Sequence, residues 1–201
     1  MLNSETSKNF SLFILAIAFV AFTYGTVKAI ERVNKTKVST TAGIYTSYVS
    51  TSKEIEQKAY ALTHNCRTEM CMVQNLLDFS STIPYKTKFY QQNSPQKTIQ
   101  ENYGDCDDKS NLLISMLHAV DIEAYFVLVP RHIFVIVPLE DMRLLEKKGL
   151  WVNNKKYYIL ESTAKESKIG FSLHYRLDEI DIIVDPFTNV KIQINSLAYK
   201  L

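Results

Sequence analysis

The sequence predicts an α+β domain with an antiparallel sheet, preceded by one transmembrane helix. Residues 10–27 form an apolar run without a charged residue. Helix-forming stretches follow between residues 53 and 120, and short runs rich in aromatic and β-branched residues follow between residues 123 and 194. A group of helices followed by several strands indicates an α+β fold.

Length and composition fit one globular domain with an appendage. The chain has 201 residues, of which 46% are hydrophobic and 22% are charged, so it can form a packed core. The net charge of +2 and the absence of a long Lys/Arg run argue against a nucleic-acid partner. The sequence also lacks a glycine-rich phosphate-binding loop.

The apolar run over residues 10–27 is at the short end of what spans the hydrocarbon core of a bilayer as a helix. Residues 34–52 are rich in Ser and Thr and are typical of a spacer, which argues against a buried helix of the domain. A cleaved signal peptide is the other alternative, but no convincing small-x-small cleavage site follows the run. We therefore predict a membrane anchor over residues 1–33, a spacer over 34–52 and a folded domain over 53–201.

Two signals for the orientation of this single-pass anchor conflict. One basic side chain, Lys8, precedes the span, whereas four lie between residues 28 and 37. The positive-inside rule then places the C-terminal domain in the cytoplasm. A disulfide between Cys66 and Cys71 would instead favour an oxidising compartment. The sequence leaves the side of the membrane open.

The three cysteines are Cys66, Cys71 and Cys106, and an odd count leaves at least one thiol free. Cys66 and Cys71 can pair only if the helix predicted around them is broken, because an unbroken helix holds their Cα atoms too far apart. Together with His64 they offer three metal ligands, whereas a structural zinc site takes four. No metal site is expected.

Residues 53–83 have a helical composition and form one long or two shorter helices. Their apolar side is marked by Val73, Leu76, Leu77 and Phe79. Pro84 ends this segment, because the residue before a proline is disfavoured in the helical region. Residues 87–101 are predicted to form a polar loop.

A further helix is expected from about Cys106 to Val120. Asp105 is a good N-cap, and Asp108 three residues later resembles the second part of a capping box. The predicted inner face consists of Cys106, Ser110, Leu113, Leu117 and Val120. Cys106 therefore begins the inner face at the first turn.

Strands are predicted over residues 123–129, 132–138 and 157–161, with two more around the turn "DPFTN" in residues 178–194. Residues 139–156 are expected to form a long loop. The only tryptophan, Trp151, lies in this loop and is expected to anchor the core.

A thiol at a helix N-terminus suits a nucleophile, because the helix dipole stabilises the thiolate. Asp105, Asp107 and Asp108 act against this, since nearby negative charge raises the pKa of a thiol such as Cys106. Cysteine hydrolases provide a histidine next to the thiol and a group that orients the histidine. The alternative interpretation of Cys106 is a small core residue, since free cysteine is often buried.

His132 fits this role best among the four histidines, because it begins a predicted strand where a polar side chain can face a cleft. Glu161 ends another predicted strand. If the two strands pair with His132 opposite Glu161, then Phe134 faces Ile159 and the carboxylate can hold the imidazole. His118 is expected on the outer side of its helix.

Four stretches in this order carry a resemblance to a known family: "NLLDFSSTIPYK", "YGDCDDKSNLL", "PRHIFVIV" and "YYILEST". They resemble the transglutaminase-like superfamily over roughly residues 70–170. The resemblance implies a papain-like core in which a central helix packs on an antiparallel sheet. It also implies Cys106 as the nucleophile, His132 as the base and Glu161 as the orienting acid. Many members carry Asp at the third position, so Glu161 is a departure with a longer reach and similar chemistry.

The sequence therefore predicts a membrane-anchored cysteine hydrolase or acyltransferase that acts on peptide or amide bonds through a Cys–His–Glu triad and a thioester. Hydrolysis is favoured over transamidation or deamidation, because the resemblance is to small microbial members, many of which look like proteases. The alternative is a catalytically inactive module that binds peptides or serves as a scaffold. The expected partners are a protein or peptide substrate and the membrane, with no nucleic acid. The chemistry requires no metal ion or organic cofactor.

Overall fold

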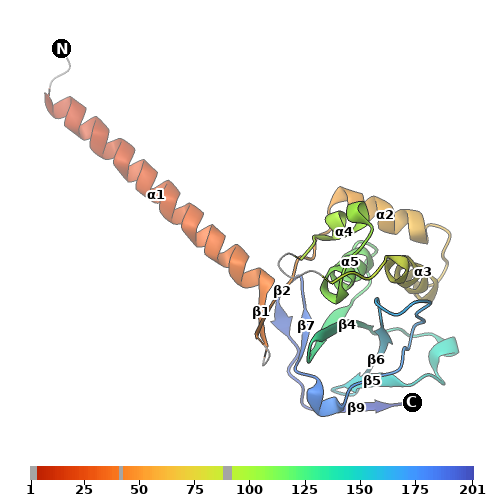
Figure 1. The fold of residues 1–201 in the computed structure, drawn as a ribbon. Helices are drawn as coiled ribbons and strands as arrows, with labels where there is room; N and C mark the ends of the chain where they lie inside the picture. The colour runs from red at the N-terminus through yellow and green to blue at the C-terminus, as the bar shows by residue number, and fades with distance from the viewer. Residues whose placement is uncertain (1–3, 41–42, 88–91) are drawn as a thin grey trace. The chain divides into compact units, whose positions relative to one another are not determined.

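The computed structural model describes residues 4–40, 43–87 and 92–201, and it divides into the units Met1–Lys37 and Val38–Leu201. The first unit is essentially the helix α1 (Ser4–Thr36), drawn in red in Figure 1. Its 21 residues Asn9–Ala29 are long and apolar enough to cross a membrane, a test that N-terminal signal sequences also pass. Large apolar side chains are exposed along this stretch, as an apolar helix in lipid requires.

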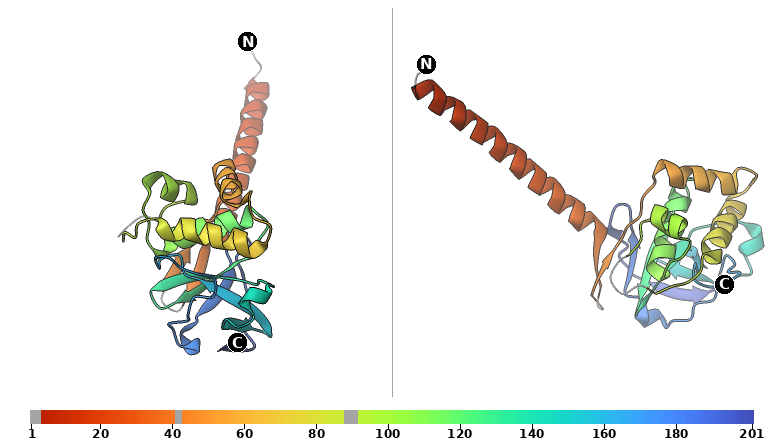
Figure 2. Two further views of the ribbon diagram at one scale, coloured as in Figure 1. Left: turned by 90° about the vertical axis from the view of Figure 1, so that its right-hand side faces the viewer. Right: turned by 45° about the horizontal axis from the view of Figure 1, so that its top comes forward.

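The second unit is an α+β domain, in which the helices lie on one face of a sheet (Figure 1). Figure 2 shows the same layering from two further sides. The helices are α2 (Lys53–Thr63), α3 (Glu69–Thr82), α4 (Pro95–Glu101) and α5 (Cys106–His118), with short 3₁₀ helices η1 (Met142–Leu144) and η2 (Leu177–Glu179). A separate two-stranded sheet is formed by β1 (Lys37–Thr40) and β2 (Gly43–Thr46).

The main sheet has seven strands in the described part of the chain, in the order β8-β7-β3-β4-β6-β5-β9. They are β3 (Tyr125–Val129), β4 (His132–Val137), β5 (Gly149–Val152), β6 (Lys155–Leu160), β7 (Ile182–Asp185), β8 (Val190–Lys191) and β9 (Leu197–Lys200). Every neighbouring pair is antiparallel. The predicted α+β fold with an antiparallel sheet is confirmed.

Three elements, α4, η1 and β5, lie where loops were predicted. The predicted polar loop over residues 87–101 contains α4, which Ser94 caps with its side chain and which ends at Asn102 in a left-handed conformation. Strand β5 lies in the second predicted loop and is joined to β6 by Asn153 and Asn154, both with positive φ. Two residues of this kind favour a tight hairpin turn. Both loop predictions were wrong because they followed the polar composition of the segments and not the capping and turn residues at the ends of these short elements.

Part of the predicted spacer packs against the domain. Tyr45 is buried at 8% exposure, and its hydroxyl accepts a hydrogen bond from Asn111 Nδ2 at 3.1 Å. The backbone N–H of Ser50 donates to Ser115 Oγ at 3.0 Å. These contacts tie residues 45–50 to α5. The division into anchor, spacer and domain at residues 33 and 52 stays a prediction.

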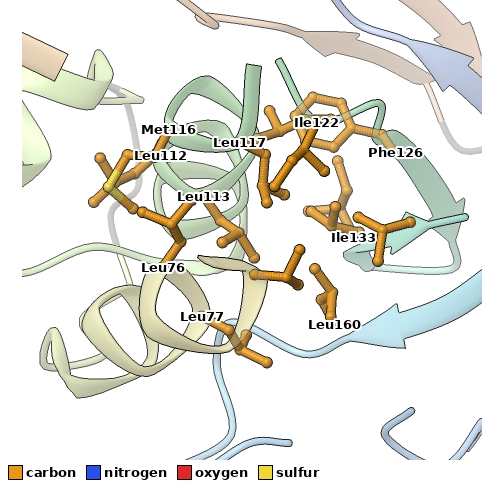
Figure 3. Close-up of a cluster of buried hydrophobic side chains, with 14 of the residues drawn as sticks. Leu76, Leu77, Leu112, Leu113, Met116, Leu117, Ile122, Phe126, Ile133 and Leu160 are labelled. Atoms are coloured by element: carbon orange, nitrogen blue, oxygen red, sulfur yellow. The ribbon is translucent and has the colours of Figure 1, made fainter. Parts of the chain in front are cut away.

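The main core lies between the helices and the sheet, and Figure 3 shows it around α5. Labelled core side chains come from α3, α5 and the sheet: Leu76, Leu77, Leu112, Leu113, Met116, Leu117, Phe126, Ile133 and Leu160. Residues 108–117 of α5 are all buried, so the helix is covered all round rather than on the one face predicted. A helix packed in this way gives the residue at its N-terminus a fixed position.

A second cluster covers the other face of the sheet. Because side chains alternate along a strand, Ile133 and Val135 face the helices, whereas Phe134 and Ile136 face away. The outward set packs on the C-terminal segment that contains Phe171, Leu173, Tyr175, Leu177, Ile192 and Ile194. Its first part, residues 171–175, is irregular and contacts His132 at the start of β4 through Tyr175.

Cys66 and Cys71 form a disulfide. The chain meets the condition derived from the sequence, because α2 ends at Thr63 and α3 begins at Glu69, which places Cys66 in the connecting turn. A disulfide is typical of proteins that fold in an oxidising compartment.

Loss of this disulfide is expected to lower the free energy of unfolding by roughly 2 kcal/mol, the chain-entropy effect of closing so short a loop. The test compares the full chain with the double variant C66S/C71S in detergent micelles, by urea unfolding followed through the fluorescence of Trp151. A reductant should destabilise the native chain and leave the variant unchanged. An equal response of the two proteins would contradict a stabilising disulfide.

Candidate active site

Cys106 is the first residue of α5, and its thiol is free and half-buried. The N-cap predicted for this helix is confirmed, because Asp105 Oδ1 accepts hydrogen bonds from the backbone N–H groups of Asp107 and Asp108, each at 3.1 Å. The capped first turn fixes the position of the thiol at the edge of the core.

The thiol lies next to a carboxylate. Cys106 Sγ donates to Asp107 Oδ1 at 3.5 Å, and Gln92 Nε2 holds the other oxygen of Asp107 at 2.6 Å. Burial, followed by the charges of Asp107 and Asp105, raises the pKa of Cys106 to about 12. Burial and the two carboxylates therefore disfavour the thiolate and favour a protonated thiol at neutral pH.

His132 and Glu161 form a hydrogen-bonded pair, with His132 Nε2 2.8 Å from Glu161 Oε2. The other carboxylate oxygen accepts from the backbone N–H of Thr163 at 3.0 Å and from its hydroxyl at 2.5 Å. Burial favours the neutral acid, but the hydrogen bonds from His132 and Thr163 outweigh it and lower the pKa of Glu161. A charged Glu161 favours the proton on Nε2 and leaves Nδ1 of the ring for other partners.

The pair forms in a register that differs from the predicted one. Strands β4 and β6 pair Ile136 with Ile159 and Val135 with Leu160. Continued by one pair, this register puts Phe134 opposite Glu161, so His132 and Glu161 are diagonal neighbours. The predicted pairing of Phe134 with Ile159 was wrong by two residues. The contact still forms because a diagonal partner is within reach of a long side chain such as glutamate.

One buried hydroxyl links the three elements that carry these side chains. Ser110, one turn after the thiol on α5, donates to the carbonyl oxygen of Ile133 at 3.4 Å and lies 3.2 Å from Ser162 Oγ. Ile133 follows His132 on β4, and Ser162 follows Glu161 after β6. Ser110 therefore links the first turns of α5 to the two chain segments that carry His132 and Glu161.

Tyr175 covers the ring of His132. Its ring stacks on His132 at 5.9 Å between centroids and on Phe134 at 6.4 Å. Burial, followed by the charges of Glu161 and Cys106, raises the pKa of Tyr175. The phenol of Tyr175 is thus close enough to interact electrostatically with both Glu161 and Cys106. No sequence pattern pointed to Tyr175, because it lies in an irregular segment far along the chain.

A buried lysine supports the same region. Lys109 is 1% exposed, and its Nζ donates to the carbonyl oxygens of Ser81 at 3.2 Å and Ile83 at 2.7 Å. Burial lowers the pKa of Lys109 to about 8, although the charge of Glu161 opposes this. The side chain satisfies carbonyls at the C-terminal end of α3 and holds that end against α5.

Of the other histidines, His174 lines the same cavity as His132 and Glu161, whereas His118 does not. The exposed His118 stacks on Phe187 at 3.8 Å between centroids, which agrees with its predicted outer position. His174 stacks on Phe171. Among the residues that the structure describes, no group of three or more His, Cys, Asp or Glu side chains is placed to hold a metal ion.

Residues 56–134 match the model of the transglutaminase-like superfamily. These residues belong to the transglutaminase-like superfamily. The matched region contains Cys106 and His132 and ends before Glu161, so the role of Glu161 depends on the geometry described above. No curated protein matches the chain.

Three solved structures are similar to the transglutaminase-like domain. A candidate cysteine protease from Cytophaga hutchinsonii is 17% identical, with a TM-score of 0.45, over 77% of this chain and 53% of that one. A candidate protease from Parabacteroides distasonis is 16% identical, with a TM-score of 0.45, over 70% of this chain and 27% of that one. LapG from Legionella pneumophila is 14% identical, with a TM-score of 0.42, over 69% of this chain and 86% of that one. Similarity at this level carries no information on activity.

The transglutaminase-like domain needs glycine just before its candidate nucleophile. Gly104 forms a parallel bridge with Tyr85, donating to Pro84 O at 3.1 Å and accepting from Lys86 N at 3.0 Å. A Cβ atom at Gly104 would lie 2.7 Å from Asp108 Cβ, which sits on the rigid first turn of α5. The backbone at position 104 therefore comes this close to the first turn of α5 only with glycine.

The substitution Gly104→Ala is expected to lower the free energy of unfolding by about 1–3 kcal/mol, because the helix backbone must shift to make room. Urea unfolding of the full chain measures this. Gly25→Ala is the matched control, since a Cβ there meets nothing within 4 Å. Equal stability of the Gly104→Ala variant and the native chain would contradict the close packing.

Proposed function

We propose that this chain is a membrane-anchored cysteine hydrolase that cleaves peptide or amide bonds with Cys106, His132 and Glu161. The observation that carries the proposal is the 2.8 Å hydrogen bond between His132 and Glu161, with the second carboxylate oxygen fixed by Thr163. A base oriented by a charged partner is the arrangement that activates a nucleophile. The link through Ser110 supports its placement beside the first turn of α5.

The raised pKa of the thiol requires its proton to leave during the attack. Because Glu161 occupies Nε2 of His132, the acceptor is Nδ1. Sγ of Cys106 bonds to the substrate carbonyl carbon while its proton moves to Nδ1, and Glu161 stabilises the imidazolium. The backbone N–H of Cys106 at the start of α5 is the expected donor to the oxyanion.

Breakdown of the tetrahedral intermediate completes the acyl transfer. The carbon–nitrogen bond breaks, and His132 gives its proton to the leaving nitrogen, which leaves a thioester on Cys106. Water then attacks the thioester with His132 as base, the carbon–sulfur bond breaks, and the thiolate takes the proton back from His132. A lysine amine in place of water would give transamidation by the same steps.

The second candidate function is a transglutaminase-like module that binds peptides without cleaving them. The observation in its favour is the thiol itself, since burial, Asp107 and Asp105 all disfavour the thiolate. In this alternative Cys106 fills space at the helix start, and the His–Glu pair only stabilises the ends of two strands.

A mixture of peptides with blocked N-termini, prepared from a digested proteome, distinguishes the two functions. The full chain in detergent micelles is incubated with the mixture, and new N-termini are labelled and identified by mass spectrometry. Cleavage that is lost in Cys106→Ala and in His132→Ala supports the hydrolase. Peptide binding without new N-termini supports the module.

The disulfide favours a domain on the oxidising side of the membrane, whereas the charges that flank the anchor favour the other side. The disulfide between Cys66 and Cys71 is expected only in an oxidising compartment, whereas the positive-inside rule favours the cytoplasm. A Glu146→Cys variant at an exposed position tests the orientation with a membrane-impermeant maleimide on intact cells. Labelling before lysis supports the oxidising side, and labelling only after lysis opposes it.

A further inference from the structure

A cavity of about 310 Å³ opens beside the His132–Glu161 pair, and both of these side chains line it. Most of the remaining wall is apolar and consists of Phe134, Ile159, Ala164, Phe171, Leu173 and Tyr175, with Thr163, Ser172 and His174 as its other polar side chains. An apolar cavity with a few convergent polar groups at one end is the usual form of a ligand site.

The position of His132 in this wall decides which part of a substrate could enter the cavity. In the proposed mechanism His132 gives its proton to the leaving nitrogen, so that nitrogen must come within hydrogen-bond distance of the ring. The atoms bonded to it then come next to the cavity that His132 lines. The cavity therefore lies on the leaving-group side of the scissile bond.

The polar groups in the wall disfavour a charged occupant. Both carboxylate oxygens of Glu161 already accept hydrogen bonds, one from His132 and the other from Thr163. Glu161 is therefore a poor partner for an ammonium group buried in the cavity. An acidic group would meet the charge of Glu161 at short range. A charge without a partner is costly to bury, whereas an apolar side chain gains free energy from the contact with Phe171 and Leu173.

The cavity also has a built wall on its outer side. Tyr175 stacks on both His132 and Phe134, and Phe171 stacks on His174 at 5.4 Å. The contacts of Tyr175 hold the irregular segment of residues 171–175 against β4, and the Phe171–His174 contact lies within the segment. The shape of the cavity is thus fixed by the packing that also fixes the His132 ring.

We propose that this cavity is the subsite for the residue that follows the scissile bond, and that it takes an aliphatic or aromatic side chain. The inference rests on the proposed function and names a substrate class for it: peptides with an apolar residue directly after the cleaved bond. The wall residue Leu173 is a specificity-determining residue for this reaction.

The cleavage assay tests the subsite at the same time as the function. New N-termini produced by the native chain should begin with Leu, Ile, Val, Met, Phe or Tyr about tenfold more often than the peptide mixture predicts, the selectivity of a good apolar pocket. A Leu173→Glu variant should lose this enrichment and favour Lys or Arg. Leu145→Glu is the matched control at an exposed leucine and should keep the native preference. Cleavage without any preference would overturn the subsite and leave the hydrolase standing.

A binding measurement tests the subsite without turnover. Amino-acid amides carry the amine and side chain of a leaving group, so the probes are the amides of phenylalanine, leucine, glycine and lysine. They are added to the full chain with Cys106→Ala, and the ring signals of His132 are followed by NMR. Phenylalanine and leucine amides should bind about tenfold tighter than glycine amide. Leu173→Glu should abolish the difference.

The two measurements separate the possible failures. Equal binding of all four amides, or a preference that survives Leu173→Glu, would overturn the subsite. Selective binding together with no cleavage of any peptide would overturn the hydrolase and the leaving-group role, and would favour the binding module. Selective binding with matching cleavage preference supports both.

Discussion

Glu161→Gln is expected to lower the rate of peptide cleavage by about 10³–10⁴-fold, the effect of holding a catalytic histidine in the wrong tautomer. The reason is the backbone N–H of Thr163, which donates to Oε1 of Glu161. The atom at this position of residue 161 must therefore be an acceptor. The amide oxygen of glutamine takes that position, so its NH₂ group faces His132 Nε2. Nε2 must then accept, the proton moves to Nδ1, and Nδ1 can no longer take the proton of the thiol.

The ring nitrogens of His132 give a readout that a purely structural role of Glu161 would not predict. Their ¹⁵N chemical shifts should show the proton on Nε2 in the native chain and on Nδ1 in the variant. Glu140→Gln is the matched control, because it makes the same change at an exposed position. Native activity in a Glu161→Gln variant with the exchanged tautomer would contradict the proposed role of Nδ1.

Local signals explain which parts of the site the sequence could predict. The N-cap at Asp105 and the start of α5 at Cys106 depend on neighbouring residues, and both are confirmed. The faces of β4 and β6 follow from the alternation of side chains, but a shift of two residues keeps every side chain on its face. The pattern therefore placed His132 and Glu161 on one face and could not fix their register.

Contacts between distant segments explain what the sequence could not predict. Tyr45 meets Asn111 across 66 positions, and Gln92 meets Asp107 across 15. Tyr175 reaches His132 from an irregular segment whose path depends on the packing of the finished sheet. Neither hydrophobic periodicity nor a capping residue predicts such contacts, because they depend on how the helices and strands pack in three dimensions.

Asp107→Asn is expected to raise the alkylation rate of Cys106 at neutral pH by about tenfold or more, since each unit of pKa changes the thiolate population tenfold. Burial would still raise the pKa of the thiol, but the largest charge that disfavours the thiolate would be gone. Because Cys66 and Cys71 are paired, iodoacetamide under non-reducing conditions modifies Cys106 selectively. For the native chain the rate should still be rising at pH 10, as a pKa of about 12 requires.

Asp121→Asn is the control, because it removes the same charge at the far end of α5 and asparagine tolerates the positive φ found there. It should leave the alkylation rate unchanged. A native rate that levels off near the ordinary pKa of about 8.5 would contradict the effect of Asp107. It would also change the mechanism, because a thiolate present before the substrate binds would not need Nδ1 of His132 as its base. In the acylation half of the reaction, His132 would then serve only as the acid for the leaving nitrogen.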